Sequence, residues 1–302
     1  MKVTELSGGV GGARLARGLA ALDGVDLSLV VNVADDERIH GLHISPDLDT
    51  VIYTLAGVEG PEGWGRAGDS FAVNEELARF GVDNSFRLGD RDLALNLFRS
   101  HRIDQGDSLS EVTRRIAEGF GVDATVLPAT DDPVRTRILT EDGTWISFQE
   151  YFVFRHHRDR VKELAFDGAE TAEPAPGVTE AIEGADLVII GPSNPPLSIW
   201  PILAVEGVKK SVEAHPRVVA VSPLLGGEAL KGPAAHVMDS LGLPEGNTGV
   251  AAAYQGLIDL LVIDQGDADD AEHITGLEVL ATDIRIPDAA TARRLAAEIV
   301  AA

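Results

Sequence analysis

The segment GLHISPDLDTVIYTLAG, residues 41–57, places two aspartates between a Ser-Pro turn and an apolar run. Pro46 restricts φ to about −65°, which favours a turn or the first position of a helix, and Asp47 and Asp49 follow at once. An aspartate in a first helical turn accepts backbone N–H bonds, so helix capping is one interpretation. However, two carboxylates this close repel each other, and a bound cation would remove the repulsion. Mg²⁺ suits such a place because it takes oxygen ligands and keeps waters and substrate phosphates in its shell.

Upstream, the first twenty-two residues predict a strand, a glycine-rich turn and a helix. Residues 3–6 are strand-like, residues 7–12 read SGGVGG, and residues 13–22 have helical spacing of apolar side chains. This arrangement presents backbone N–H groups to a phosphate, although a tight structural turn is the alternative interpretation. It is not a Walker A motif because no Gly-Lys-Ser/Thr follows, and Arg14 takes the place of the third glycine of GxGxxG.

Polar residues also follow three apolar runs that are typical of buried parallel strands, at 27–33, 185–190 and 217–221. Ligands in open α/β sheets bind at the carboxyl ends of strands, so these residues are expected to converge on one edge. A nucleotide or another phosphate ligand is the simplest occupant of that crevice. Asp36 has the alternative role of capping a turn. The strand-end candidates are Asn32, Asp36, Ser193, Asn194 and Ser222.

The remaining patterns complete an α/β prediction: a Rossmann-like, mainly parallel sheet flanked by helices, with a smaller inserted region. Residues 1–150 and 184–302 are expected to form a nucleotide-binding core that includes a helical acceptor-side region. Residues 151–183 are expected to form an insertion or a small subdomain. We predict helices at 71–80, 90–102, 109–120, 234–241, 249–256 and 289–300, strands at 122–127, 260–263 and 277–280, and a 135–148 hairpin continued by a strand at 149–154.

Composition excludes several classes of protein. The chain has 49 acidic and 25 basic residues, a formal net charge of −24, which argues against a nucleic-acid partner. Only five of the basic residues are lysines, so we expect either a halophilic surface or an acidic mesophilic one. There is no cysteine for a disulfide or thiolate site, and no apolar run of about eighteen residues for a membrane span. We therefore expect a cytoplasmic protein without a membrane partner.

Several motifs, in this order and over most of the chain, resemble the 2-phospho-L-lactate transferase family of deazaflavin coenzyme biosynthesis. The resemblance implies a Rossmann-like core, dependence on Mg²⁺ and a homodimer. It also implies transfer of a phospholactyl group from lactyl-2-diphospho-5'-guanosine to the ribityl hydroxyl of 7,8-didemethyl-8-hydroxy-5-deazariboflavin (Fo), which releases GMP and forms coenzyme F-420-0. The motifs are SGGVGGARL, VVNVADD, the 41–57 segment, FRLGDRDLA, ATDDPVRT, FQEYFV, GPSNPP and VAVSP.

The resemblance also implies roles for individual residues. Asp49 and Arg87 would hold Fo, and Asp49 with Asp47 would be catalytic. Asp36, Asp47 and Asp49 are the expected Mg²⁺ ligands. The residues expected at the guanosine donor are Ser7, Gly8, Gly9, Gly11, Gly12, Asn32, Ser193, Asn194 and Ser222.

Attack of a hydroxyl on a diphosphate needs charge neutralisation and in-line positioning more than covalent catalysis, which agrees with this set of residues. Three alternatives stay open. Some bacterial relatives use a phosphoenolpyruvyl-diphospho-guanosine donor, and a regulatory nucleotide-binding protein can share the fold. An NAD-dependent oxidoreductase is disfavoured by the incomplete GxGxxG. A mere nucleotide binder has no need of Asp49 and Arg87 together.

Overall fold

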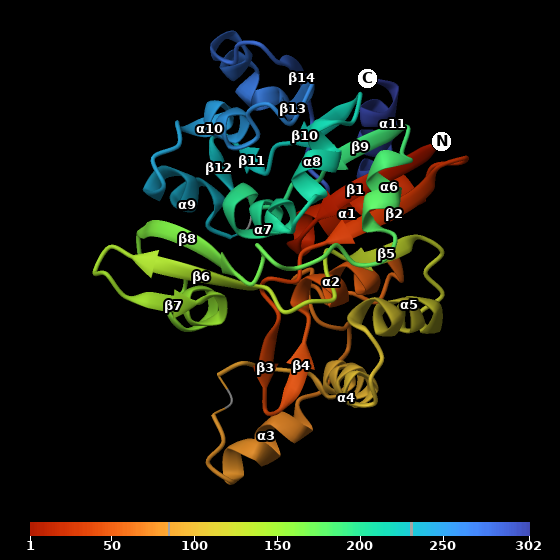
Figure 1. Cartoon of the computed structure of the whole chain (residues 1–302), viewed down its shortest axis with the longest axis vertical. Coiled ribbons are helices and arrows are strands. Elements are labelled where there is room, and N and C mark those ends of the chain that lie inside the picture. The colour runs from red at the N-terminus through yellow and green to blue at the C-terminus, as the bar shows by residue number, and fades with distance from the viewer. Residues whose placement is uncertain (84, 230–231) are drawn as a thin grey trace.

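A seven-stranded sheet lies at the centre of the computed structural model, which describes residues 1–83, 85–229 and 232–302 (Figure 1). The strand order is β14-β13-β10-β9-β1-β2-β5, and all neighbouring pairs are parallel. The predicted α/β class is therefore confirmed. The strands are β1 (Lys2–Ser7), β2 (Asp26–Val31), β5 (Thr125–Pro128), β9 (Leu187–Ile190), β10 (Val218–Val221), β13 (Leu260–Asp264) and β14 (Glu278–Thr282).

Both faces of the sheet are covered by helices, because alternate strand residues are apolar toward each side. In β9, for example, Ile189 packs into one core and Ile190 into the other. The first core is closed by α1 (Gly9–Ala20), α2 (Pro46–Leu55), α4 (Asp90–Asp104), α5 (Leu109–Gly119) and α11 (Ala289–Ala301). The second is closed by α6 (Val178–Glu183), α7 (Trp200–Ala204), α8 (Val208–Glu213), α9 (Ala234–Ser240) and α10 (Gly246–Ala253).

The chain reverses its direction across the sheet between β1 and β9. From β1 it proceeds through β2 to β5 on one side, and from β9 through β10 and β13 to β14 on the other. Such a reversal opens a crevice outside the carboxyl ends of the two central strands, where ligands bind in open α/β sheets. The segments that leave these two strands are the glycine-rich turn and the Gly191–Pro196 loop.

A second, antiparallel sheet packs beside this edge (Figure 1). It has the order β7-β6-β8 and consists of β6 (Arg135–Thr140), β7 (Trp145–Ser147) and β8 (Val161–Asp167). Its own small core joins Ile138 and Tyr151 to Leu197 and to Val237 of α9. The small sheet spans residues 135–167, so it begins before the insertion expected at residues 151–183 and ends before that segment does.

Two local predictions are wrong. Helix α1 begins at Gly9 and not at residue 13, because the glycines form its first turn and allow the close contacts described below. Residues 149–154 are not a strand: Glu150–Phe154 form a π-helix, and the Ser147 hydroxyl accepts the Glu150 N–H at 3.1 Å where the chain turns away from β7. The sequence analysis also missed a hairpin of β3 (Glu37–Ile39) and β4 (Leu42–Ile44), which turns at His40 and Gly41 with positive φ at both.

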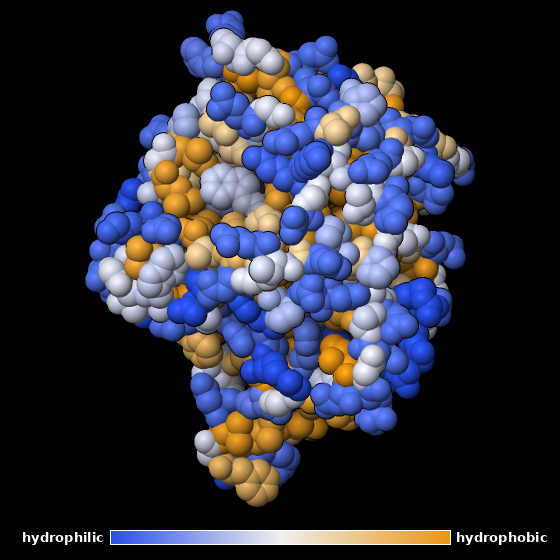
Figure 2. All heavy atoms as spheres, in the orientation of Figure 1, coloured by the Kyte–Doolittle hydropathy of each residue, from blue (hydrophilic) through white to orange (hydrophobic). Residues whose placement is uncertain are grey.

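Two aspartates join α3 (Ala72–Arg79) to α4 by capping reciprocally. Asp69 accepts the backbone N–H groups of Arg91 and Asp92, and Asp90 accepts those of Ala72 and Val73. These two helices form the arm at the lower end of Figure 1, and Figure 2 shows apolar side chains on its surface. Among the described residues, no helix has the length and apolarity needed to cross a bilayer.

The remaining short elements are β11 (Leu224–Leu225), β12 (Glu228–Ala229), a π-helix at Pro195–Ile199 and a 3-10 helix at Gln265–His273. β11 and β12 pair across a turn at Gly226 and Gly227, which both have positive φ.

Candidate functional site

The glycine-rich turn and the Gly191–Pro196 loop are joined by hydrogen bonds at the point where the sheet reverses. The Ser193 hydroxyl accepts the Gly8 N–H at 3.1 Å and donates to the Gly8 carbonyl at 2.8 Å. A Cβ on Gly11 would lie 2.1 Å from the Pro192 carbonyl oxygen, so only glycine permits this approach. Gly9 has a φ of +64°, which begins the helix at a sharp angle. The first turn of α1 thus packs against the Gly191–Pro196 loop that follows β9.

Asp47 connects this turn to the next strand. Its carboxylate accepts the Gly9 N–H at 2.9 Å and the Asn32 side-chain amide at 3.1 Å. It therefore does not cap its own helix α2, where no side chain fills that role. Burial raises the pKa of Asp47 to about 6, and the negative charge of Asp36 adds to the increase, while Asn32 and Gly9 oppose it.

Asp36 and Asp35 bring further negative charge to the same place. One carboxylate oxygen of Asp36 accepts from the Ser45 hydroxyl at 2.7 Å and lies 2.8 Å from His43 Nε2. The Thr136 hydroxyl donates to Asp35 at 3.3 Å. Burial raises the pKa of Asp35 well above its ordinary value, and the charges of Asp47 and Asp36 raise it further. Asp35 follows the same strand as Asp36, at a strand end where site residues were expected, and it belongs to this cluster.

Asp49 has a partner that the sequence analysis missed, namely Arg99 of α4. Both side chains are buried: 1% of the Arg99 side-chain surface and 8% of the Asp49 side-chain surface are exposed. The Arg99 guanidinium binds both carboxylate oxygens of Asp49. Asn96 also accepts from this guanidinium. Burial raises the pKa of Asp49 to about 7, and the charge of Arg99 works against the increase. The signal in the sequence is an arginine on the buried face of α4, three residues after Asn96, but its partner could not be identified from spacing.

Three residues that were predicted for the site, Arg87, Asn194 and Ser222, each make a defined contact with another residue of the chain. Arg87 is exposed and stacks over the Phe71 ring at 4.3 Å, and within the described chain no hydrogen bond or ion pair joins it to Asp49. Asn194 caps the Pro195–Ile199 helix by accepting the Leu197 N–H. Ser222 donates to Asn247 at 2.6 Å and accepts the Leu224 N–H, which shapes the turn after β10.

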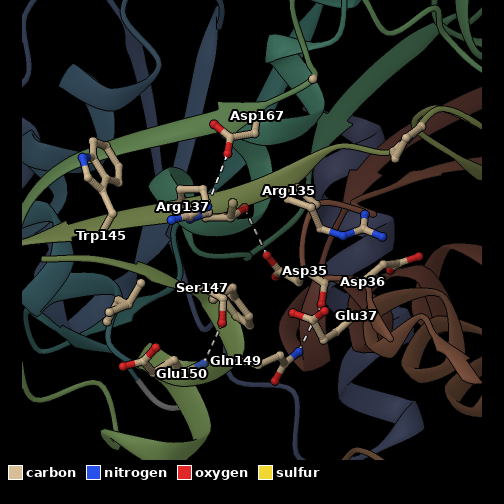
Figure 3. A pocket seen from close by; sticks show the side chains of 16 residues that line it. Asp35, Asp36, Glu37, Arg135, Arg137, Trp145, Ser147, Gln149, Glu150 and Asp167 are labelled. Atoms are coloured by element: carbon tan, nitrogen blue, oxygen red, sulfur yellow. Dashed lines mark hydrogen bonds and ion pairs between the residues drawn. The ribbon is translucent and has the colours of Figure 1, made fainter. Parts of the chain in front are cut away.

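A cavity of about 580 Å³ opens beside the carboxylates, between the main sheet edge and the small sheet (Figure 3). Asp35 and Asp36 border it, with Arg135 beside them, and Arg137 and Trp145 lie farther across. Gln149 donates to the Asp35 backbone carbonyl at 3.1 Å and ties the π-helix to this wall. The sequence analysis predicted the hairpin that carries these residues but did not assign them to the site.

Two of the carboxylates, those of Asp36 and Asp47, have the chemistry to hold Mg²⁺ together with substrate phosphates. No group of three or more His, Asp or Glu side chains in residues 1–83, 85–229 and 232–302 is arranged as a ready metal site. Mg²⁺, however, is usually held by one or two carboxylates together with substrate phosphates and waters. The negative charge of Asp36 raises the pKa of Asp47, and a cation near both carboxylates would relieve that repulsion. Asp49 is already neutralised by Arg99 and is the weakest of the three expected ligands.

Comparison with solved structures defines the class first. A UPF0052-family protein from Bacillus halodurans superimposes with a TM-score of 0.69 at 17% identity, covering 99% of this chain and 98% of that one. The chain therefore has the α/β fold of that group. A sequence model described as "2-phospho-L-lactate transferase CofD" matches residues 3–302, and the chain belongs to this family of transferases.

Curated relatives agree with the family model. The 2-phospho-L-lactate transferase of Methanopyrus kandleri is 40% identical, over 99% of this chain and 97% of its own length. The same enzyme from Methanocaldococcus jannaschii is 38% identical over 99% and 97%. The phosphoenolpyruvate transferase of Kitasatospora aureofaciens is 42% identical over 88% and 86%.

Proposed function

We propose that this transferase moves a phospholactyl group from lactyl-2-diphospho-5'-guanosine to the ribityl hydroxyl of Fo. The acceptor oxygen forms a bond to the phosphorus that carries the lactyl group, and the bond from that phosphorus to the bridging oxygen breaks. GMP leaves with the bridging oxygen, and the hydroxyl proton passes to a carboxylate. The observation that carries the proposal is the contact of Asp47 with Gly9 and Asn32, which places buried carboxylates at the glycine turn.

The donor is proposed to bind along the crevice between β1 and β9. The first turn of α1 would receive the diphosphate through the backbone N–H groups that follow Gly9, because those of Gly8 and Gly9 already donate to Ser193 and Asp47, and through the positive end of the helix. Ser193 would act by holding Gly8 in place, because its hydroxyl is already bonded to that residue. Asn32, Asn194 and Ser222 shape the adjoining strand ends.

Asp36 and Asp47 would hold Mg²⁺ against the donor phosphates. Bound there, Mg²⁺ supplies neutralisation of the charge that develops on the diphosphate. The protein contributes the two carboxylates in fixed positions, through the hydrogen bonds from Ser45 and Asn32.

On the acceptor side, Asp49 is the proposed proton acceptor and orienting group. A pKa of about 7 is suited to a general base near neutral pH, and Arg99 fixes the carboxylate in one orientation. Arg87 offers a planar cation next to an aromatic ring on the arm, which suits contact with a flat deazaflavin. Both roles are proposed for the same substrate, Fo.

The test is an assay of the purified protein with Mg²⁺, Fo and each of two guanosine donors. We expect GMP release and F-420-0 formation with the lactyl donor. Faster turnover with the phosphoenolpyruvyl-diphospho-guanosine donor would assign the three-carbon group differently, as in the relatives named phosphoenolpyruvate transferase. Binding of GDP without turnover of either donor would favour a regulatory nucleotide-binding protein.

A further inference from the structure

A glutamate lies in the middle of the central strand, buried from solvent and without a hydrogen-bond partner among the described residues. Glu5 of β1 is 0% exposed and lies between Leu29 of β2 and Ile189 of β9. Neither of its carboxyl oxygens has a hydrogen-bond partner in the described part of the chain, and the hydroxyl of Ser7 is also buried and without one. Because alternate strand residues share a face, Glu5 and Ser7 point to the same side of β1.

The surrounding backbone leaves room for this carboxyl. A Cβ on Gly191 would lie 2.4 Å from Glu5 Oε1 and 3.2 Å from the Gly12 Cα. A Cβ on Gly12 would lie 2.2 Å from the Ser7 hydroxyl oxygen. Glu5 and Ser7 therefore lie beneath the first turn of α1, on the inner side of the proposed diphosphate site.

No cation reaches Glu5 from the elements packed around it. On α1, Arg14 donates to the Ile286 carbonyl and Arg17 pairs with Glu59. On α2, Asp47 is bonded to Gly9 and Asn32. Burial raises the pKa of Glu5 well above its ordinary value, and Ser7 is the side chain that opposes the increase. Because an unpaired buried charge is costly, these surroundings favour the neutral carboxylic acid form of Glu5.

We propose that Glu5 is a positioning residue for the anion bound at the start of α1. When the anion binds, the acid O–H of Glu5 donates to the Ser7 hydroxyl oxygen, so the hydrogen of Ser7 is directed away from Glu5 and toward a phosphate oxygen. An apolar site that keeps a carboxylic acid neutral so that it can donate is a known device in enzymes. An ionised Glu5 would instead accept from Ser7 and repel the phosphates. This inference rests on the proposed function, since it assumes a diphosphate at this turn.

The experiment is a double-mutant cycle on GDP affinity, measured by calorimetry with the full chain. We expect Glu5→Leu and Ser7→Ala each to weaken GDP binding by roughly tenfold, and the double variant to be no weaker than either one. Glu5→Gln keeps a donor and should bind within about threefold of the unmodified protein. Thr4→Val, on the opposite face of the same strand, is the matched control. Additive losses, or unchanged affinity of Glu5→Leu, would overturn the inference.

An infrared measurement tests the protonation state separately from affinity. The unmodified protein should show a protonated-carboxyl C=O band that Glu5→Gln lacks, and GDP should shift that band. Absence of the band at neutral pH would overturn the role of Glu5 as a donor. Failure of the unmodified protein to bind GDP would instead overturn the proposed function, and the positioning role with it. Thermal unfolding of each variant shows whether it is folded, and Glu5→Gln, which is nearly isosteric, keeps the test valid if Glu5→Leu unfolds.

Discussion

The guanidinium of Arg99 and the carboxylate of Asp49 form a buried ion pair between α4 and α2. The pair connects the arm formed by α3 and α4 to the carboxylate cluster at the sheet edge. Removing one member of such a pair leaves an uncompensated buried charge, which costs about 3–5 kcal/mol. The residue with the strongest predicted role in catalysis is thus also a structural partner, and the two roles must be separated by experiment.

Asp49→Asn should reduce transfer by about 10²-fold or more, because it removes the positioned carboxylate. It should also lower the free energy of unfolding, since Arg99 stays buried without its counter-charge. Adding Arg99→Met to this variant should restore much of the stability without restoring activity. Denaturant titration and turnover at saturating Fo measure the two effects. Full turnover in either variant would remove Asp49 from the proposed catalytic role.

Ser193→Ala and Asn194→Ala should affect different properties. Loss of the Ser193 hydroxyl leaves Gly8 without its partner and should raise the KM for the guanosine donor several-fold, while the KM for Fo changes less. Loss of the Asn194 cap should lower stability by about 1 kcal/mol. Titration of GDP against the two single variants and the double variant checks this. Undiminished GDP affinity in the double variant would count against this loop as the donor site.

Without Mg²⁺, the protein should lose stability as the pH rises from about 4 to about 6. The folded-state pKa of Asp47 is raised to about 6, so at this carboxylate the folded protein binds more protons than the unfolded chain. This favourable contribution is present at low pH and is lost as the pH passes through the raised pKa. Thermal midpoints at several pH values measure the effect, and Asp47→Asn should flatten the curve. Millimolar Mg²⁺ should raise the midpoint at pH 7; no response to Mg²⁺ would argue against a site at Asp36 and Asp47.

The acidic surface should make the protein most stable at molar salt. With a net charge of −24, carboxylate repulsion is weakened as the Debye length falls from about 10 Å at 0.1 M to about 3 Å at 1 M salt. Thermal unfolding in a KCl series at fixed Mg²⁺ checks the prediction. A midpoint that is flat or falls toward molar KCl would mean that the charge has another purpose than stability in salt.

The sequence by itself determined the fold class, because apolar runs of strand length alternate with helical patterns along the chain. Periodicity is a local property, and so the central strands and the start of α2 at Pro46 were predicted within a few residues. The ends of the parallel strands identified Asn32 and Asp36, since side chains there meet at one edge, and the two close carboxylates after Ser45-Pro46 identified Asp47. Local pattern reasoning failed at residues 149–154, where aromatic residues and a valine favour a strand but Glu150–Phe154 form a π-helix.

Only the tertiary structure decided the partners of the buried charges. Arg99 is fifty residues from Asp49, Ser193 is 185 residues from Gly8, and Glu5 has no partner that spacing could reveal. The physical reason is that a buried polar group is satisfied by whatever the fold brings within hydrogen-bond distance, and that distance is unrelated to separation along the chain. The sequence therefore determined which end of the sheet carries the carboxylates, and packing determined which carboxylates are paired, which repel one another and which must stay protonated.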